Sequence, residues 1–280
     1  MTNSADPNCT HFFHYSNEDF LFSHAYGAGM AQFSAHMHDI YELLFIKKEG
    51  VSYSLEGKNY ELPKNSLVIS RPLKLHSLSL KNPDDYDRYC ILFDSERLSS
   101  DICGQISPDV DVIHFDGNSL VCDLFKKMDY YCEHFEKETL QVVLTHLIEE
   151  VLYNVVIASK NFKQSSVYTV NPFINAAIEY MEQHITEPLT VDAVCQNLHI
   201  TKSHLHNLFI KHLKITPKKY ITSKKLTMAQ RELRSGLKPT EVHLNLGFTD
   251  YTTFFRDYKK YFGHAPSEEI SMQIIRRIES

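Results

Sequence analysis

Residues 20–98 are built from short segments in which apolar and polar positions alternate. The stretch 51–55 alternates strictly, and further apolar segments lie at 41–46, 60–62, 67–69 and 89–93. A period of two places every second side chain on the same face of a strand. Turn-forming residues at 56–59 join two of the segments into a hairpin. Many short strands separated by turns predict a β-sandwich or a small barrel.

Between Ser119 and Ser159 the apolar period changes to that of a helix. Apolar residues recur there at spacings of three and four, which predicts amphipathic helices. The shorter and the longer stripe consist of Leu120, Leu124, Phe125 and Met128, and of Leu140, Leu144, Leu147, Val151 and Val155.

Residues 188–266 contain one pattern twice, at a period near fifty residues. Residues 205–209 align with 254–258, and each segment follows a turn between two short helical stretches. Such self-similarity indicates a repeated structural unit. The pattern predicts two helix-turn-helix units joined by a long helix that begins at Thr216-Pro217 and ends at Gly236. Four threonines are predicted to cap helices at their N-termini: Thr190, Thr201, Thr240 and Thr249.

The two turns carry residues that suit a left-handed backbone. Gly247 adopts a positive φ without steric cost. His199 occupies the corresponding position of the first unit and tolerates this conformation better than most residues. His243, in the first helix of the second unit, is bulky for a tight helix crossing, so we expect looser packing there.

The net charge changes sign between the N-terminal half of the chain and the half that contains the repeat. Residues 172–280 carry 15 Lys and Arg against 11 Asp and Glu, whereas residues 1–171 carry 14 against 24. A basic half suits nucleic acid and an acidic half does not. The length of 280 residues favours two domains. Six scattered cysteines without a C-x-x-C pair indicate reduced thiols, and no signal peptide or membrane span is predicted.

A cluster of metal-ligating residue types lies in the strand-rich half. His36, His38 and Glu42 have the same parity along the chain, and His76 follows as the last residue of a Pro-x3-His motif. Their side chains can therefore share one face. Three imidazoles and a carboxylate suit zinc, iron, nickel or manganese. The same residues also suit a pocket that binds a polar ligand by hydrogen bonds, without a metal.

The C-terminal repeat resembles the DNA-binding domain of the AraC/XylS family of bacterial transcription regulators. The matching residues are Gly247-Phe248-Thr249-Asp250, Phe254, Arg256, Tyr258-Lys259-Lys260, Gly263 and Pro266, with Leu205, Phe209, Pro217, Tyr220 and Leu226 in the first half. The sequence departs from the family pattern at Cys195, His199 and His243. The His-x-His-x3-Glu stretch and the hairpin after it resemble the cupin-like sensor barrel of the same family.

This resemblance implies an α+β protein with two domains. We expect a cupin-like effector-sensing barrel at 1–118, a helical dimerisation segment at 119–160, a linker at 161–171 and a double helix-turn-helix domain of about seven helices at 172–280. The stripes in 119–160 either form the dimer or simply cover the open face of the barrel. The expected lining of the effector site is His36, His38, Tyr41, Glu42, Arg71 and His76, with Tyr53 and Tyr89 as further candidates.

The second helix of each unit is expected to enter a major groove, with the two grooves about 34 Å apart. The predicted base contacts are Ser203, His206 and Asn207 on the first helix, and Tyr251, Thr252, Phe255 and Arg256 on the second. Arg256 is the best candidate for reading a guanine, unless it pairs with Asp257. The predicted phosphate contacts are Lys202, Lys218, Lys219, Lys224, Lys225, Lys259 and Lys260.

The sequence therefore predicts a cytoplasmic, non-enzymatic transcription regulator and favours an activator over a repressor. Its predicted partners are operator DNA, a small polar effector such as a carbohydrate, RNA polymerase and a second copy of the chain, with no membrane. A divalent metal in the barrel is a further candidate ligand, and no other cofactor is expected. Two alternatives stay open: a metal-dependent cupin enzyme with an accessory DNA-binding domain, and control by a protein partner that binds the acidic half.

Overall fold

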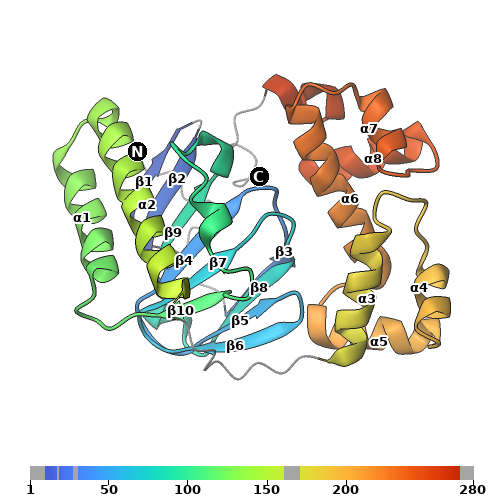
Figure 1. Ribbon diagram of the computed structural model, residues 1–280, viewed down its shortest axis with the longest axis horizontal. Helices are drawn as coiled ribbons and strands as arrows, with labels where there is room; N and C mark the ends of the chain where they lie inside the picture. The colour runs from blue at the N-terminus through green and yellow to red at the C-terminus, as the bar shows by residue number, and fades with distance from the viewer. Residues whose placement is uncertain (1–9, 18, 28–30, 161–170, 272–280) are drawn as a thin grey trace.

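The computed structural model describes residues 10–17, 19–27, 31–160 and 171–271. An N-terminal domain of antiparallel strands and two helices lies beside a C-terminal domain that is entirely helical (Figure 1). The predicted α+β class with two domains is confirmed. The predicted linker at 161–171 falls, except for its last residue, outside the described residues.

In the described part of the N-terminal domain, ten strands form two antiparallel sheets. The larger sheet has the order β1-β2-β9-β4-β7-β10 and the smaller one β3-β8-β5-β6. The larger sheet comprises β1 (Thr10–Ser16), β2 (Phe20–Tyr26), β9 (Asp87–Phe93), β4 (Tyr41–Ile46), β7 (Ser66–Ser70) and β10 (Val112–His114). The smaller sheet comprises β3 (Gln32–His36), β8 (His76–Leu80), β5 (Val51–Leu55) and β6 (Lys58–Leu62).

The alternation seen in the sequence sorts side chains between two cores. On β5, Val51, Tyr53 and Leu55 are buried between the two sheets, while the intervening serines are half-buried. On β4, Leu44 faces the same inter-sheet core, whereas its neighbour Phe45 faces the opposite side. The larger sheet is thus apolar on both faces, since a second core lies between it and two helices.

Those helices are α1 (Leu120–His134) and α2 (Lys137–Lys160), and they cover the outer face of the larger sheet (Figure 1). The predicted stripes are buried against that sheet, with the exception of Leu120, which is 68% exposed. Covering the sheet, which was one of the two predicted roles, therefore accounts for the stripes. α2 is long and apolar enough to span a membrane, but its apolar residues other than Val142, Tyr153 and Ile157 belong to this core.

Within residues 171–271 the C-terminal domain contains six α-helices and a 3-10 helix. They are α3 (Pro172–Gln183), α4 (Val191–Asn197), α5 (Lys202–Leu213), α6 (Pro217–Arg234), α7 (Pro239–Asn245), α8 (Tyr251–Phe262) and η4 (Pro266–Ser271). The pairs α4–α5 and α7–α8 are the two helix-turn-helix units, and α6 connects them (Figure 1). Each unit has its own apolar core, anchored by Leu205 and Phe209 in the first and by Phe254 and Tyr258 in the second.

Capping follows the prediction in the first unit and differs from it in the second. The side chains of Thr190, Thr201 and Thr216 accept backbone N–H groups at the starts of α4, α5 and α6. The predicted caps Thr240 and Thr249 are wrong. Pro239 takes the first helical position of α7, which makes Lys238 the cap. The Asp250 carboxylate caps α8 by accepting from Thr253 N at 2.7 Å, and a carboxylate is the stronger acceptor.

Both turns have the predicted left-handed backbone. The φ angle is 53° at His199 and 61° at Gly247. A Cβ atom at residue 247 would lie 2.5 Å from the backbone of Glu187, so this turn also requires glycine for space. His243 is half-buried and packs against the rings of Tyr251 and Phe254.

Candidate DNA-binding face and histidine–glutamate cluster

The start of α5 presents the side chains predicted to read the first groove. Ser203, His206 and Asn207 are all exposed. With residues from the starts of α4 and α6 they line a shallow hollow, whose rim includes Lys202 and Lys218. Lys202 pairs with Asp192 across this hollow at 2.5 Å. The hollow therefore offers amide, imidazole and hydroxyl groups beside two exposed ammonium groups.

The start of α8 presents the second predicted set. Tyr251, Thr252 and Arg256 are exposed, whereas Phe255 is half-buried. The Arg256 Nε atom lies 3.5 Å from an Asp257 oxygen, but 69% of the arginine side chain stays accessible. Because the pair is solvent-exposed and its separation is long, it holds the guanidinium only weakly. Arg256 thus remains able to contact a base.

The predicted phosphate-contacting lysines divide into two groups. Lys202, Lys218, Lys219, Lys259 and Lys260 are exposed. Lys224 and Lys225 are only 4% and 5% exposed. The prediction of phosphate contacts for these two is corrected, because both ammonium groups are enclosed by protein acceptors.

Lys225 joins the two helix-turn-helix units. From the middle of α6 its Nζ donates to Glu187 O at 2.6 Å, just before α4, and to Leu246 O and Gly247 O at 2.7 and 3.1 Å, in the turn after α7. Burial lowers the pKa of Lys225 to about 8. The side chain is therefore still charged at pH 7, with three donors for three carbonyls. We call this contact the Lys225 clasp; no local sequence pattern predicts it.

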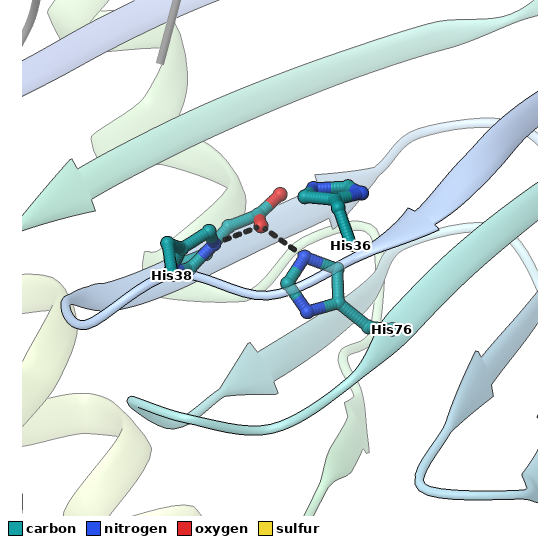
Figure 2. Close-up of side chains that lie close together, drawn as sticks. His36, His38 and His76 are labelled. Carbon is teal, nitrogen blue, oxygen red and sulfur yellow. Dashed lines mark hydrogen bonds and ion pairs between the residues drawn. The ribbon is translucent and has the colours of Figure 1, made fainter. Parts of the chain in front are cut away.

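The four residues of the predicted ligand cluster do come together. His36 ends β3, His38 follows it, Glu42 lies on β4 and His76 begins β8. One ligand atom from each lies within 4.8 Å of the other three (Figure 2). The Nε2 atoms of His38 and His76 are each 3.1 Å from Glu42 Oε2. Strand register explains the gathering, since His36 pairs directly with His76 across β3 and β8.

Each imidazole of the cluster is held by a main-chain carbonyl. The Nδ1 atoms of His36, His38 and His76 lie 2.9 Å from the oxygens of Ser34, Ile40 and Lys74, respectively. A carbonyl only accepts, so each Nδ1 carries the hydrogen and each ring presents Nε2 to the cluster.

Glu42 is half-buried and ionised. Burial alone would raise the pKa of its carboxyl, but His38 and His76 outweigh that effect and hold the pKa well below its usual range. The second carboxylate oxygen receives the Cys90 thiol at 3.8 Å. The cluster thus combines a carboxylate with three oriented ring nitrogens, and its burial ranges from exposed at His36 to buried at His76.

The other residues predicted to line the effector site lie apart from this cluster. Tyr41 has the opposite parity from Glu42, so it stacks on Phe93 on the helix-covered face. Arg71 donates to Asp111 Oδ1 at 3.2 Å and to two carbonyls, in a structural ion pair. Tyr89 packs toward α1, where its hydroxyl donates to Asp129. Tyr53 alone adjoins the cluster, with its ring stacked 6.1 Å from that of His76.

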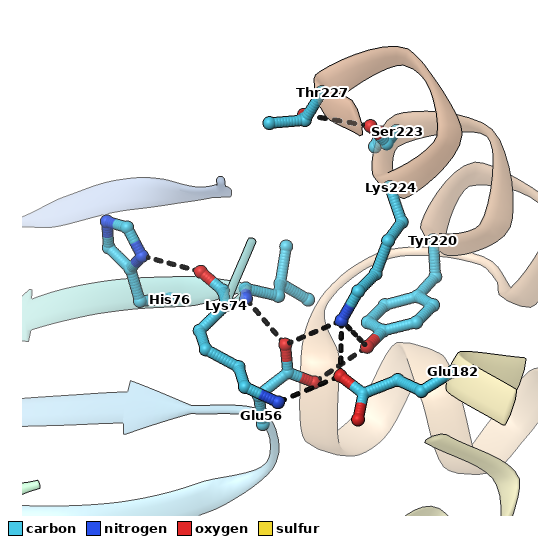
Figure 3. A network of polar contacts seen from close by, with 9 residues as sticks. Glu56, Lys74, His76, Glu182, Tyr220, Ser223, Lys224 and Thr227 are labelled. Carbon is cyan, nitrogen blue, oxygen red and sulfur yellow. Dashed lines mark hydrogen bonds and ion pairs between the residues drawn. The ribbon is translucent and has the colours of Figure 1, made fainter. Parts of the chain in front are cut away.

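A partly buried polar network joins the N-terminal domain to α3 and α6 of the C-terminal domain (Figure 3). Glu56, in the β5–β6 turn, accepts Tyr220 OH from α6 at 2.8 Å and Leu75 N at 2.7 Å. Glu182 on α3 accepts both Lys74, at 2.8 Å, and Lys224. Burial alone would raise the pKa of Glu182, but Lys224 and Lys74 lower it. Nothing local in the sequence marks these partners, which lie up to 164 residues apart.

A second set of contacts extends the interface. Arg234, at the end of α6, donates to Asp39 at 2.5 Å and to Glu269 at 3.1 Å. Met37 and Leu75 are buried in the same apolar core as α3 and α5. Residues adjacent to three of the four cluster residues therefore contact the C-terminal domain.

Comparisons with known proteins address both halves of the chain. Residues 21–109 match the AraC-like ligand binding domain, and residues 194–270 match a helix-turn-helix domain. The regulatory protein SoxS of Salmonella typhimurium is 30% identical over 96 residues, which is 34% of this chain and 90% of SoxS. The XylDLEGF operon transcriptional activator 2 of Pseudomonas putida is 26% identical over 157 residues, 55% of this chain and 93% of that protein. The lactose operon transcription activator of Staphylococcus xylosus is 22% identical over 231 residues, 78% of each chain.

Proposed function

Because the chain belongs to the AraC/XylS family of DNA-binding transcription regulators, we propose that α5 and α8 read successive major grooves of one operator. An effector bound in the N-terminal domain controls this reading. The observation that carries the proposal is the exposure of both predicted reading surfaces, Ser203, His206 and Asn207 on α5 and Tyr251, Thr252 and Arg256 on α8.

The contacts divide by chemistry. Asn207 and Arg256 can each make two hydrogen bonds to a base edge, to adenine and guanine respectively. The five exposed lysines contact phosphates and supply the salt-dependent, sequence-independent part of the affinity. Phe255, half-buried beside the exposed set, meets a thymine methyl or a sugar.

The effector is a small polar molecule, and a carbohydrate is the class we favour. Support comes from the hydrogen-bonding groups of the cluster and from the name of the Staphylococcus relative, which concerns a lactose operon. The liners nearest to one another are His36, His38, Glu42 and His76. A metal-dependent enzyme is the less favoured alternative, because the relatives named above are transcription regulators.

We further propose that the chain acts as a homodimeric activator in the cytoplasm and contacts RNA polymerase. Its sensing, dimerisation, linker and DNA-binding segments are 1–118, 119–160, 161–171 and 172–280. Since the apolar stripes pack against the larger sheet, the dimer surface is the opposite face of α1 and α2. Tyr130, Val142, Tyr153 and Ile157 are exposed there, each by 47% or more.

Base and phosphate contacts can be separated on a duplex that the purified protein selects from a random library. Arg256→Ala should relax selectivity at one position and cost about 1–3 kcal/mol on the preferred base pair. Lys260→Ala should weaken all sequences alike and reduce the slope of affinity against salt by about one. Lys64→Ala, an exposed lysine in the N-terminal domain, serves as the control. Uniform loss of affinity in both test variants would contradict the assignment, and failure to protect about two helical turns in footprinting would contradict the reading of two grooves.

A further inference from the structure

We propose that His36, His38, Glu42 and His76 bind one divalent transition-metal ion, and that this ion loosens the contact between the N-terminal domain and the first helix-turn-helix unit. The second clause rests on the proposed function, since it concerns how operator binding is regulated. The metal site itself stands on the geometry of the four side chains.

The orientation of the imidazoles favours a cation over a hydrogen-bonded cluster. Each Nδ1 donates to a carbonyl at 2.9 Å, so each ring directs Nε2 toward the cluster. The Nε2 atoms of His38 and His76 both lie 3.1 Å from one oxygen of Glu42, and with the Nδ1 hydrogens in place each ring could donate to it only by carrying a second hydrogen. His76 Nε2 is buried and makes no hydrogen bond of acceptable geometry within the described residues. A cation among the four atoms removes this requirement.

The arrangement also matches how proteins hold metal-binding histidines. Such a ring usually donates its second nitrogen to a carbonyl or carboxylate, which fixes the tautomer and the direction of the lone pair. All three rings of the cluster have this support from the main chain. Imidazole and carboxylate donors in this ratio suit Zn²⁺, Ni²⁺, Fe²⁺ or Mn²⁺ rather than Ca²⁺ or Mg²⁺, which prefer oxygen ligands.

Metal binding must draw the cluster together. The four ligand atoms lie within 4.8 Å of one another. In a tetrahedral zinc site with bonds of about 2.0–2.1 Å, the ligand atoms are roughly 3.3 Å apart. The widest separation therefore closes by up to about 1.5 Å when the ion enters, and the segments that carry the ligands follow.

These segments form the interface with the DNA-binding domain. His36 and His38 point into the cluster, whereas Met37 between them packs in the core of the first helix-turn-helix unit. Asp39 pairs with Arg234 of α6. Leu75, just before His76, belongs to the same core as Met37 and donates its N–H to Glu56. Because successive side chains on an extended chain point to opposite sides, drawing the histidines inward moves Met37 and Leu75 away from the DNA-binding domain.

The metal site is tested with the full-length protein after treatment with a chelator. Titration calorimetry with ZnCl₂ should show one site per chain, and CoCl₂ should produce the visible absorption bands of a tetrahedral cobalt centre. Both signals should be lost in His38→Asn and weakened at least tenfold in Glu42→Gln. The matched control His114→Gln, an exposed histidine of the same domain, should retain them. Circular dichroism checks that each variant is folded. Equal zinc binding by wild type and His38→Asn, or no binding by folded wild type, would overturn the site.

The regulatory clause is tested on the selected duplex. Zn²⁺ should raise operator affinity at least fivefold in the wild type, within the usual range of coupling between two sites. The increase should be absent in His38→Asn and small in Arg234→Gln, where the interface is already weakened. Zinc binding without any change in operator affinity would overturn the coupling and leave the site intact. A protein that binds zinc but selects no duplex would instead contradict the proposed function, and the two failures are thus distinguishable.

Discussion

Lys225→Met tests whether the Lys225 clasp holds the two helix-turn-helix units together. Methionine keeps most of the apolar stem but removes three N–H donors from the carbonyls of Glu187, Leu246 and Gly247. A hydrogen bond to a charged group contributes about 1.5–3 kcal/mol, so three of them outweigh the cost of burying the ammonium. That cost is on the order of 3 kcal/mol, from a pKa lowered to about 8. We therefore expect a net destabilisation of about 3 kcal/mol.

Thermal unfolding followed by circular dichroism measures this loss, with Lys219→Met on the exposed side of the same helix as the control. For a domain of the size of the C-terminal domain, a loss of about 1 kcal/mol in the free energy of unfolding lowers Tm by about 4–8 °C. The expected decrease in Tm therefore exceeds about 10 °C. A phosphate contact would give a different result. Unfolding would then be unaffected, while the slope of operator affinity against salt would fall by about one. That outcome would refute the clasp and restore the prediction made from sequence.

Three further predictions follow from particular contacts. His24 is buried between Asp129 and Asp87; burial alone would lower its pKa, but the two carboxylates raise it. The stabilisation from these ion pairs should therefore be complete below about pH 6.5 and disappear as pH rises through the folded-state pKa of His24. In urea unfolding, His24→Gln should lower the free energy of unfolding most in acid and less toward pH 8. A decrease that is independent of pH would contradict this. Gly247→Ala should cost at least about 2 kcal/mol in thermal unfolding, because its Cβ would meet the Glu187 backbone at 2.5 Å; Gly236→Ala, with positive φ but open space, should cost clearly less, and equal losses would show that only φ matters. Asp39→Asn should raise operator affinity of the metal-free protein severalfold in fluorescence anisotropy, because it weakens the pair with Arg234; unchanged affinity would mean that this pair does not restrain the DNA-binding domain.

Periodicity was sufficient to predict the strands β4, β5, β6, β7 and β9, the repeat, and the gathering of His36, His38, Glu42 and His76. The parity rule that grouped His36, His38 and Glu42 also excludes Tyr41, which has the opposite parity and faces the helices. Applying the rule to every candidate would have removed Tyr41 from the effector site. His199 was likewise placed correctly, because few residue types accept its φ of 53°.

The partners of buried charges could not be predicted. Arg71 is neutralised by Asp111, forty residues away, and no local pattern connects the two. Lys224 and Lys225 lie on a helix rich in lysine, and lysine is ordinarily exposed. Only the tertiary structure brings acidic groups and carbonyls to their ammonium groups. The apolar stripes of α1 and α2 were correct as helical faces, but periodicity alone does not say which surface they cover.

The two buried lysines place the interdomain contact next to the element that spaces the reading helices. Lys224 connects α6 to Glu182 and lies 3.9 Å from Glu56 of the N-terminal domain. Lys225, the next residue, connects α6 to the loop before α4 and to the turn after α7. A helix is stiff between adjacent residues. A force that the N-terminal domain exerts on Lys224 therefore acts on the turn of α6 in which Lys225 fixes α5 relative to α8. Because operator reading requires both helices in successive grooves, the N-terminal domain can change DNA affinity through this one turn of α6, without touching either reading surface.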